Sequence, residues 1–324
     1  MKIDISKDST ELGNKSADFV SKKIVELVAA ADSSKNIRVI VATGASQFNF
    51  IKALVSIPNI PWDRVEFFHL DEYVGLDQGD QHPASFRKYL NERLFANLNP
   101  SAAAINLVDP DNIEQYAALL AAEDIDLACI GIGENGHVAF NDPPVADFND
   151  PVLVKIVELD EACRKQQVGE GWFKSISTTP SHAVTLTIPA IMRCKTISCV
   201  VPDERKAKAV LGTIHDEIGT ACPATCLRNH ADSYLWLDQP SASLLPKDVE
   251  RNEMMLLLIR NTIKTKTKTK NKIKNPNSNS NKTTSKIHPI HRIHRIHRIH
   301  HHVPFPSSIS KSTVTKDVIL VMQH

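Results

Sequence analysis

Short apolar runs alternate with amphipathic segments through residues 1–245, a pattern that predicts repeated strand–helix units. Runs rich in β-branched and aromatic residues predict strands at Ile37–Ala42, Val65–Leu70, Ile105–Val108, Ile125–Ile132, Val152–Val157, Ala183–Leu186, Thr196–Val201 and Tyr234–Leu237. Apolar residues that recur every three or four positions predict helices at Leu12–Ala31, Phe48–Val55, Phe86–Leu94, Asn112–Glu123, Glu161–Gln167 and Asp203–Ile214, the first with Ser9 and Thr10 as candidate caps. This alternation predicts an α/β fold whose mostly parallel sheet carries helices on both faces.

The alternating pattern ends near Leu245. Beyond it, residues 264–270 alternate Lys and Thr, residues 275–281 are rich in Asn and Ser, and residues 288–300 repeat His-Arg-Ile. Such a composition cannot bury a core, so we expect one domain over residues 1–245 and a disordered tail over residues 246–324. Short strict repeats are typical of translated simple-sequence DNA, which favours a gene-model artefact. A metal-binding His tract and a basic tail for nucleic acid or anionic lipid are the alternatives.

Charge divides the chain at the same place. The whole sequence has 38 basic and 37 acidic residues, but residues 261–302 hold eleven of the basic ones and no acidic one. The remainder is therefore acidic, which gives no reason to expect a nucleic-acid or membrane partner. No apolar stretch approaches the roughly 20 residues of a membrane helix, and the N-terminus shows no signal-peptide pattern. The six Cys lack CxxC spacing, which favours reduced thiols in the cytoplasm over a zinc site.

Three polar segments directly follow predicted strands, where parallel sheets bind their ligands: Thr43–Ser46, His69–Tyr73 and Gly131–Asp142. Gly131–Asp142 (GIGENGHVAFND) combines glycines, which permit a tight turn, with an imidazole and carboxylates suited to acid–base chemistry. The alternative is a glycine-rich turn with a solvated His137. Asp71 and Glu72 end another strand, and because neighbours on an extended chain point in opposite directions, only one of them is expected to face a pocket. Either could instead be a capping or solvated acid.

The Thr43–Ser46 segment and one further segment are candidates for binding an anion. Thr43-Gly44-Ala45-Ser46 is a strand-to-helix turn that suits a phosphate, although a plain helix cap explains it equally well. It lacks the P-loop lysine and the GxGxxG spacing, so neither a nucleoside triphosphate nor a dinucleotide site is supported. Residues 203–206 (DERK) open a predicted helix, where Lys206 opposes the helix dipole unless an anion lies nearby. A solvated charge cluster is the alternative.

Together these segments resemble the glucosamine-6-phosphate deaminase/isomerase family over most of residues 1–245. Leu70–Gly75 (LDEYVG) is similar to that family's DEYVG motif, and Gly131–Asn141 (GIGENGHVAFN) is similar to its GxGxxGHxxFNEP motif. The related 6-phosphogluconolactonases usually continue GHTASLFP, whereas this chain reads GHVAFNDPP. The resemblance implies a Rossmann-like three-layer α/β/α fold. It also implies conversion of glucosamine 6-phosphate and water to fructose 6-phosphate and ammonia, in the catabolism of amino sugars such as N-acetylglucosamine.

The resemblance also implies roles for the acid–base residues. Asp71 would move a proton between C2 and C1 of the sugar. His137 would open the pyranose ring, supported by Asp142 in the place of the family's Glu, and Asn135 stands where the family has Asp or Asn. Glu72 would be a supporting neighbour of the substrate site.

The remaining roles concern the phosphate. The turn of Thr43, Gly44, Ala45 and Ser46 would hold it together with Lys206, and Gly136 lies in the substrate loop. The family often has an Arg before Phe-Phe where residues 169–173 read GEGWF, so Arg164 is our substitute anion ligand. The turn reads TGAS rather than TGGTP, and a positive φ at Ala45 would be strained.

These expectations define an enzyme with a small sugar phosphate as its partner and with no cofactor or metal. A 6-phosphogluconolactonase-type hydrolase and a non-catalytic sugar-phosphate sensor are the alternatives. A homo-oligomer is left open, because surfaces without motifs carry no signal for it.

Overall fold

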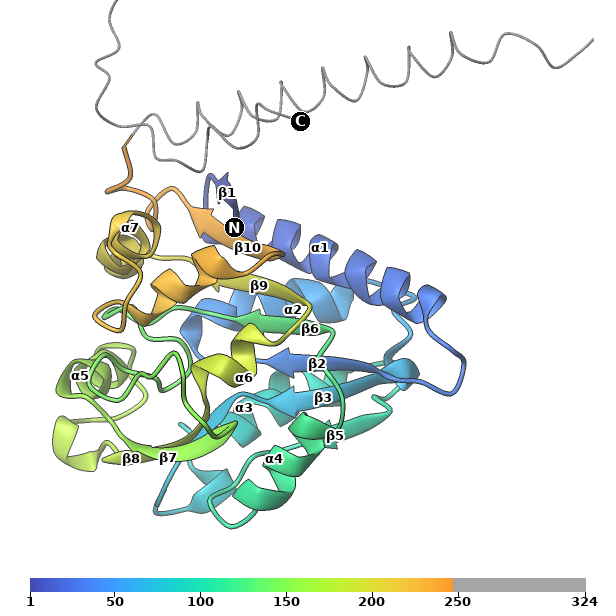
Figure 1. Ribbon diagram of the computed structural model, residues 1–324, viewed down its shortest axis with the longest axis horizontal. Helices are drawn as coiled ribbons and strands as arrows, with labels where there is room; N and C mark the ends of the chain where they lie inside the picture. Colours follow the sequence, from blue (N-terminus) through green and yellow to red (C-terminus); the bar gives the residue numbers. More distant parts are fainter. Residues whose placement is uncertain (247–324) are drawn as a thin grey trace, which may run out of the picture. The chain divides into compact units, whose positions relative to one another are not determined.

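The computed structural model describes residues 1–246. Its centre is a parallel sheet of seven strands, with helices packed around it (Figure 1). The strands lie in the order β1-β10-β9-β6-β2-β3-β5. Their bounds are β1 Lys2–Ser6, β2 Ile37–Val41, β3 Val65–His69, β5 Ala104–Asn106, β6 Leu127–Ile130, β9 Thr196–Val201 and β10 Ser233–Asp238. All pairings between neighbours are parallel, so the C-terminal ends of the strands meet at one edge. This confirms the predicted α/β fold.

Two apolar cores cover the two faces of this sheet. Residues that alternate along each strand belong to different cores: Ile40 and Phe68 pack in one, and Val39 and Phe67 pack in the other. Helices α1 (Ser9–Ala30), α2 (Phe48–Ser56) and α3 (Phe86–Arg93) pack on the face of Val39, whereas α4 (Ile113–Ala122), α6 (Ile188–Met192) and α7 (Ala207–His215) pack on the other. The three-layer arrangement follows from strands that are apolar on both sides.

A small antiparallel sheet stands beside the main one. It has the order β4-β8-β7 and is formed by β4 (Asp71–Tyr73), β7 (Val154–Glu158) and β8 (His182–Leu186). A third apolar cluster joins β4 to helix α5 (Glu161–Gly169) through Tyr73, Phe140 and Cys163. Short 3₁₀ turns complete the fold: η1 Ala45–Gln47, η2 Trp62–Arg64, η3 Gly79–Gln81, η4 Phe95–Asn97, η5 Ile176–Thr178, η6 Glu204–Lys206 and η7 Pro223–Asn229.

The differences from the sequence predictions lie in short or half-polar elements. The pattern did not predict β1, β4 or α6, each of which has six residues or fewer. Helix α1 is capped by Asp8, whose carboxylate accepts from the backbone N–H groups of Thr10 and Glu11. The predicted cap residues Ser9 and Thr10 therefore already belong to the helix. The helix predicted from Asp203 begins as the turn η6 and becomes regular only at Ala207.

In the last described turn the Leu245 N–H donates to Ala242 O, and both side chains pack against the core on the α7 face of the sheet. Apart from its first residue, the predicted tail lies outside the described residues. Within residues 1–246, no helix combines the length and the apolar character needed to cross a membrane.

Candidate active site

A cavity of about 70 Å³ lies at the C-terminal edge of the main sheet. Its walls come from the segments that follow β2, β3, β6 and β9 and from the end of helix α5. The lining residues are Ala42, Thr43, Gly44, Ala45, Ser46, Leu70, Asp71, Phe86, Gly131, Ile132, Gly133, His137, Ala139, Phe140, Gln166, Gln167, Glu170 and Lys206. The three segments that sequence patterning singled out thus meet at one place.

The Thr43–Ser46 turn contributes all four of its residues to the cavity wall. Gly44 has φ +94°, a conformation that L side chains rarely adopt, and its carbonyl accepts from the Tyr89 hydroxyl at 3.1 Å. Ala45 is not among the residues with positive φ, so the strain expected from the missing glycine does not arise. The turn leads through η1 into α2, and a helix N-terminus next to backbone N–H groups favours an anion.

Asp71 faces the cavity and Glu72 does not, as their adjacent positions on an extended strand predicted. Asp71 is 6% exposed; burial, with a smaller contribution from Glu72, raises its pKa well above the usual value. A carboxylate that is costly to ionise binds a proton strongly. Asp71 is therefore suited to take up a proton from carbon and return it.

The Glu72 carboxylate points instead into the protein and is fully buried. It accepts from the backbone N–H groups of Tyr73, Phe86 and Arg87 and from the Ser85 hydroxyl. Except for Tyr73, which belongs to β4, these donors stand at the start of α3, so Glu72 fastens β4 to that helix. The structure does not bring Glu72 to the cavity, where the resemblance had placed it, and Glu72 acts on Asp71 by helping to raise the pKa of that carboxyl group.

His137 reaches the cavity from the loop after β6, and Asp142 lies behind it. The distance from His137 Nδ1 to Asp142 Oδ1 is 2.7 Å, although the ring N–H is not aligned for a regular hydrogen bond. Burial opposes ionisation of Asp142, but the His137 imidazole and further donors outweigh it and lower the carboxyl pKa. A carboxylate held ionised beside an imidazole stabilises the protonated ring, as proton transfer requires. The shorter Asp in the place of Glu still reaches the histidine directly.

Asn135 and Gly136 shape this loop without lining the cavity. Asn135 Nδ2 donates to Asp142 Oδ1 at 2.9 Å, and its Oδ1 accepts from the His137 N–H at 3.0 Å, so one amide holds both partners. Gly136 has φ +82°, and a Cβ there would lie 2.6 Å from Cys222 Sγ. At Gly133 a Cβ would lie 2.2 Å from the His137 ring, so the imidazole occupies the space that this glycine leaves free.

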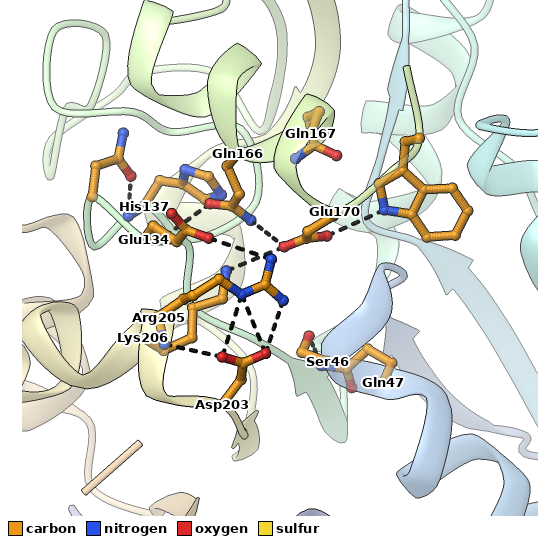
Figure 2. Close-up of polar contacts among 12 residues, drawn as sticks. Ser46, Gln47, Glu134, His137, Gln166, Gln167, Glu170, Asp203, Arg205 and Lys206 are labelled. Carbon is orange, nitrogen blue, oxygen red and sulfur yellow. Dashed lines mark hydrogen bonds and ion pairs between the residues drawn. The ribbon is translucent and has the colours of Figure 1, made fainter. Parts of the chain in front are cut away.

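Lys206 provides the cation of the cavity, whereas Arg164 lies elsewhere. Arg164 Nη2 donates to the carbonyls of Ile176 and Thr179, which holds the η5 turn against α5. The Lys206 side chain is 5% exposed, and its Nζ lies 3.5 Å from Glu170 Oε1. Figure 2 shows Glu170 pointing toward Lys206 from the end of α5. Sequence reasoning noticed the GEGWF segment only as a departure from a motif and gave Glu170 no role.

Gln166 and Gln167 were also missed by sequence reasoning. Both line the cavity from α5. Gln166 Oε1 accepts from the Glu134 N–H, and its Nε2 donates to Glu170 Oε1, each at 2.8 Å. Gln167 Oε1 accepts from the Tyr73 hydroxyl at 2.7 Å. Their polar character on a buried helix face was the signal that could have identified them.

One group of side chains has the ligand types of a metal site. His137, Asp142 and Cys163 offer three atoms within 4.8 Å of one another. Burial, followed by the charge of Asp142, raises the pKa of the Cys163 thiol well above its usual value. The thiolate that binds metals is therefore disfavoured, and the other two side chains pair with each other.

Comparisons with known proteins identify the family. Residues 7–236 match the family described as glucosamine-6-phosphate isomerases/6-phosphogluconolactonase. Relatives named glucosamine-6-phosphate deaminase include one from Exiguobacterium sibiricum, 32% identical over 264 residues, which span 78% of this chain and 96% of the relative. Another, from Bacillus cereus strain G9842, is 32% identical over 250 residues, which span 75% of this chain and 91% of the relative.

Solved structures agree with this assignment. A monomeric glucosamine-6-phosphate deaminase of the NagB superfamily is 26% identical, with a TM-score of 0.65, and the match covers 75% of this chain and all of that one. A 6-phosphogluconolactonase from Thermotoga maritima is 22% identical, with a TM-score of 0.57, and the match covers 73% of this chain and 98% of that one. The second likeness supports the fold alone.

Proposed function

This chain belongs to the family of glucosamine-6-phosphate isomerases and 6-phosphogluconolactonases, and we propose that it is a glucosamine-6-phosphate deaminase. It converts glucosamine 6-phosphate and water to fructose 6-phosphate and ammonia. The observation that carries this proposal is that two separate acid–base groups, Asp71 and His137, line one cavity with an anion-binding turn and Lys206. Aldose–ketose conversion with ring opening needs such a combination.

Ring opening is the first step. As the C1–O5 bond breaks, the C1 hydroxyl loses its proton and becomes the aldehyde oxygen, and His137, paired with Asp142 at 2.7 Å, carries that proton to the ring oxygen. The Thr43–Ser46 turn and Lys206 hold the phosphate, which anchors the sugar at a point remote from the reacting carbons. The other end of the sugar can then reach Asp71.

Proton transfer between carbons follows. Asp71 removes the proton from C2 of the open aldehyde, which gives an enolamine, and returns it to C1, which gives an imine at C2. Water adds to this imine, and ammonia leaves as the C2 ketone of fructose 6-phosphate forms. One carboxylate serves both carbons because its two oxygens can face adjacent atoms.

We further propose that this reaction takes place in the cytoplasm and belongs to the catabolism of amino sugars. The sugar phosphate is the partner that the cavity requires. The six cysteines, all free and buried, fit a reducing compartment.

Product analysis with a panel of substrates tests the proposal. The purified chain is incubated separately with glucosamine 6-phosphate, galactosamine 6-phosphate, N-acetylglucosamine 6-phosphate and 6-phosphogluconolactone. We expect ammonia and a ketose phosphate from an amino-sugar phosphate with a free amine, and no acceleration of lactone hydrolysis. Lactone hydrolysis without ammonia release would make the protein a lactonase, and binding without turnover would make it a sensor.

A further inference from the structure

An acidic side chain of the protein occupies the cavity next to its lysine. Glu170 Oε1 lies 3.5 Å from Lys206 Nζ, and the two side chains are 6% and 5% exposed. Gln166 Nε2 donates to Glu170 Oε1 at 2.8 Å, and Trp172 Nε1 donates to Oε2 at 3.2 Å (Figure 2). The carboxylate is thus surrounded by donors, as a bound anion would be.

Glu170 narrows the cavity, whose volume is about 70 Å³, below the roughly 300–1,000 Å³ of most pockets for small molecules. Withdrawal of the Glu170 side chain would widen it next to Lys206. Glu170 stands between Gly169 and Gly171, and glycines on both sides give this short segment conformational freedom.

We propose that Glu170 determines specificity through the anion position, the place beside Lys206 Nζ where an anion would bind. The Glu170 carboxylate occupies this position in the free protein, and the phosphate of the substrate displaces it. The inference rests on the proposed function for the identity of that substrate. A sugar without a phosphate cannot take the place of Glu170, because its entry would leave the Lys206 ammonium buried and unpaired. A phosphate restores the pairing with at least equal charge. The exchange therefore admits sugar phosphates and excludes free amino sugars.

Binding of inorganic phosphate, measured by calorimetry on the full chain, tests this exchange without requiring turnover. The variant Glu170→Gln keeps the size and the hydrogen-bond acceptor of the side chain but removes its charge. If Glu170 leaves the anion position unoccupied only about a tenth of the time, the variant should bind phosphate roughly tenfold more tightly than the wild type. Glu161→Gln is the matched control, because Glu161 lies on α5, is 68% exposed, pairs with Lys165 at 2.6 Å and does not line the cavity. It should change the Kd less than about twofold.

Three additional measurements make the outcome unambiguous. Glu170→Ala removes the carboxylate from the anion position and should also bind phosphate more tightly. Circular dichroism establishes that each variant is folded. In the wild type, saturation with phosphate should change the tryptophan fluorescence, because Trp172 loses its hydrogen bond to Glu170; the change should be absent in Trp172→Phe.

Three results would overturn the inference: equal affinity of wild type and Glu170→Gln for phosphate, weaker binding by Glu170→Gln, or no binding in any variant. Weaker binding of glucosamine 6-phosphate but not of fructose 6-phosphate by Glu170→Gln would assign Glu170 to the amine of the substrate instead. These results are independent of the deaminase assay, whose failure in the wild type would reject the proposed function and leave the phosphate measurement standing.

Discussion

Two buried aspartates near the cavity have carboxyl pKa values shifted in opposite directions. Burial and the neighbouring Glu72 raise the pKa of Asp71, whereas the His137 imidazole overcomes burial and lowers that of Asp142. One carboxyl group therefore accepts protons readily, and the other stays ionised. The two residues are of the same type, so their neighbours cause the difference between the two carboxyl pKa values.

Replacing Asp71 with Asn should separate catalysis from binding. The amide keeps the shape of the side chain but cannot accept a proton from carbon. We expect kcat to fall at least about 100-fold, the lower end of what a general base contributes, while the Kd for fructose 6-phosphate changes little. Parallel rate and calorimetric measurements check this. An equal loss of binding and rate would mean that Asp71 holds the fold or the ligand instead.

The same substitution should stabilise the folded protein at neutral pH. Because the folded pKa of Asp71 lies above its unfolded value, the folded state holds the proton more tightly, and ionisation at higher pH costs stability. The amide carries no such cost. Thermal unfolding of Asp71→Asn should therefore occur at a higher temperature than that of the wild type at pH 7, and the gap should close below about pH 4, near the unfolded pKa of Asp. A lower unfolding temperature at pH 7 would contradict the account.

Sequence reasoning selected Asp71 and His137, which the structure places in one cavity, but it did not predict the contacts between side chains. The alternation of an extended strand correctly separated Asp71 from Glu72. The choice of Arg164 as an anion ligand failed because its guanidinium is used by the carbonyls of Ile176 and Thr179. Glu170 could not be assigned because its partner, Lys206, is distant in the sequence.

Helix α3 and strand β4 are held together by the buried Glu72 carboxylate. Glu72→Ala leaves the N–H groups of Phe86 and Arg87 without this acceptor and should lower the free energy of unfolding by roughly 3 kcal/mol, the order seen when one member of a buried charged network is removed. Urea denaturation measures this. Glu92→Ala is the control, because that side chain is 63% exposed and pairs with Lys88 only at 3.9 Å; its effect should stay below about 0.5 kcal/mol. Equal effects of the two variants would reject the anchoring role.

The loop after β6 places its histidine through a glycine. In Gly133→Ala, the new methyl group would lie 2.2 Å from the His137 ring and would push it from the cavity. We expect a loss of about 100-fold in kcat/KM, as misplacement of a catalytic group by about 1 Å can cause. Gly219→Ala is the control, because its nearest contact would be Glu217 O at 3.9 Å. Normal activity of Gly133→Ala would show that His137 is not required in this position.

The central strands were predictable and the small elements were not. Runs such as Ile37–Val41 are buried on both sides, so their composition alone identifies them. β1 is half-exposed at the sheet edge, and β4 has only three residues, so neither shows a clear periodicity of apolar residues. Both strands form because they pair with distant segments, and the local sequence pattern gives no information about such pairing.

The acidic domain and the basic segment 261–302 differ in composition. We expect residues 1–245 to fold and to catalyse the reaction without the rest of the chain. They include the whole cavity and the packing of Leu245 against the core. A chain that ends at Leu245 should therefore keep the kcat/KM of the full chain within about twofold and unfold at a similar temperature. Loss of folding on truncation would show that residues 246–324 contribute to the structure.

The most direct test of the account is the release of ammonia from glucosamine 6-phosphate by the purified full chain, with fructose 6-phosphate measured in the same samples. The account predicts equal amounts of the two products from the wild type, and rates at least about 100-fold lower from Asp71→Asn. Absence of both products from the folded wild type, or equal rates for wild type and variant, would contradict it.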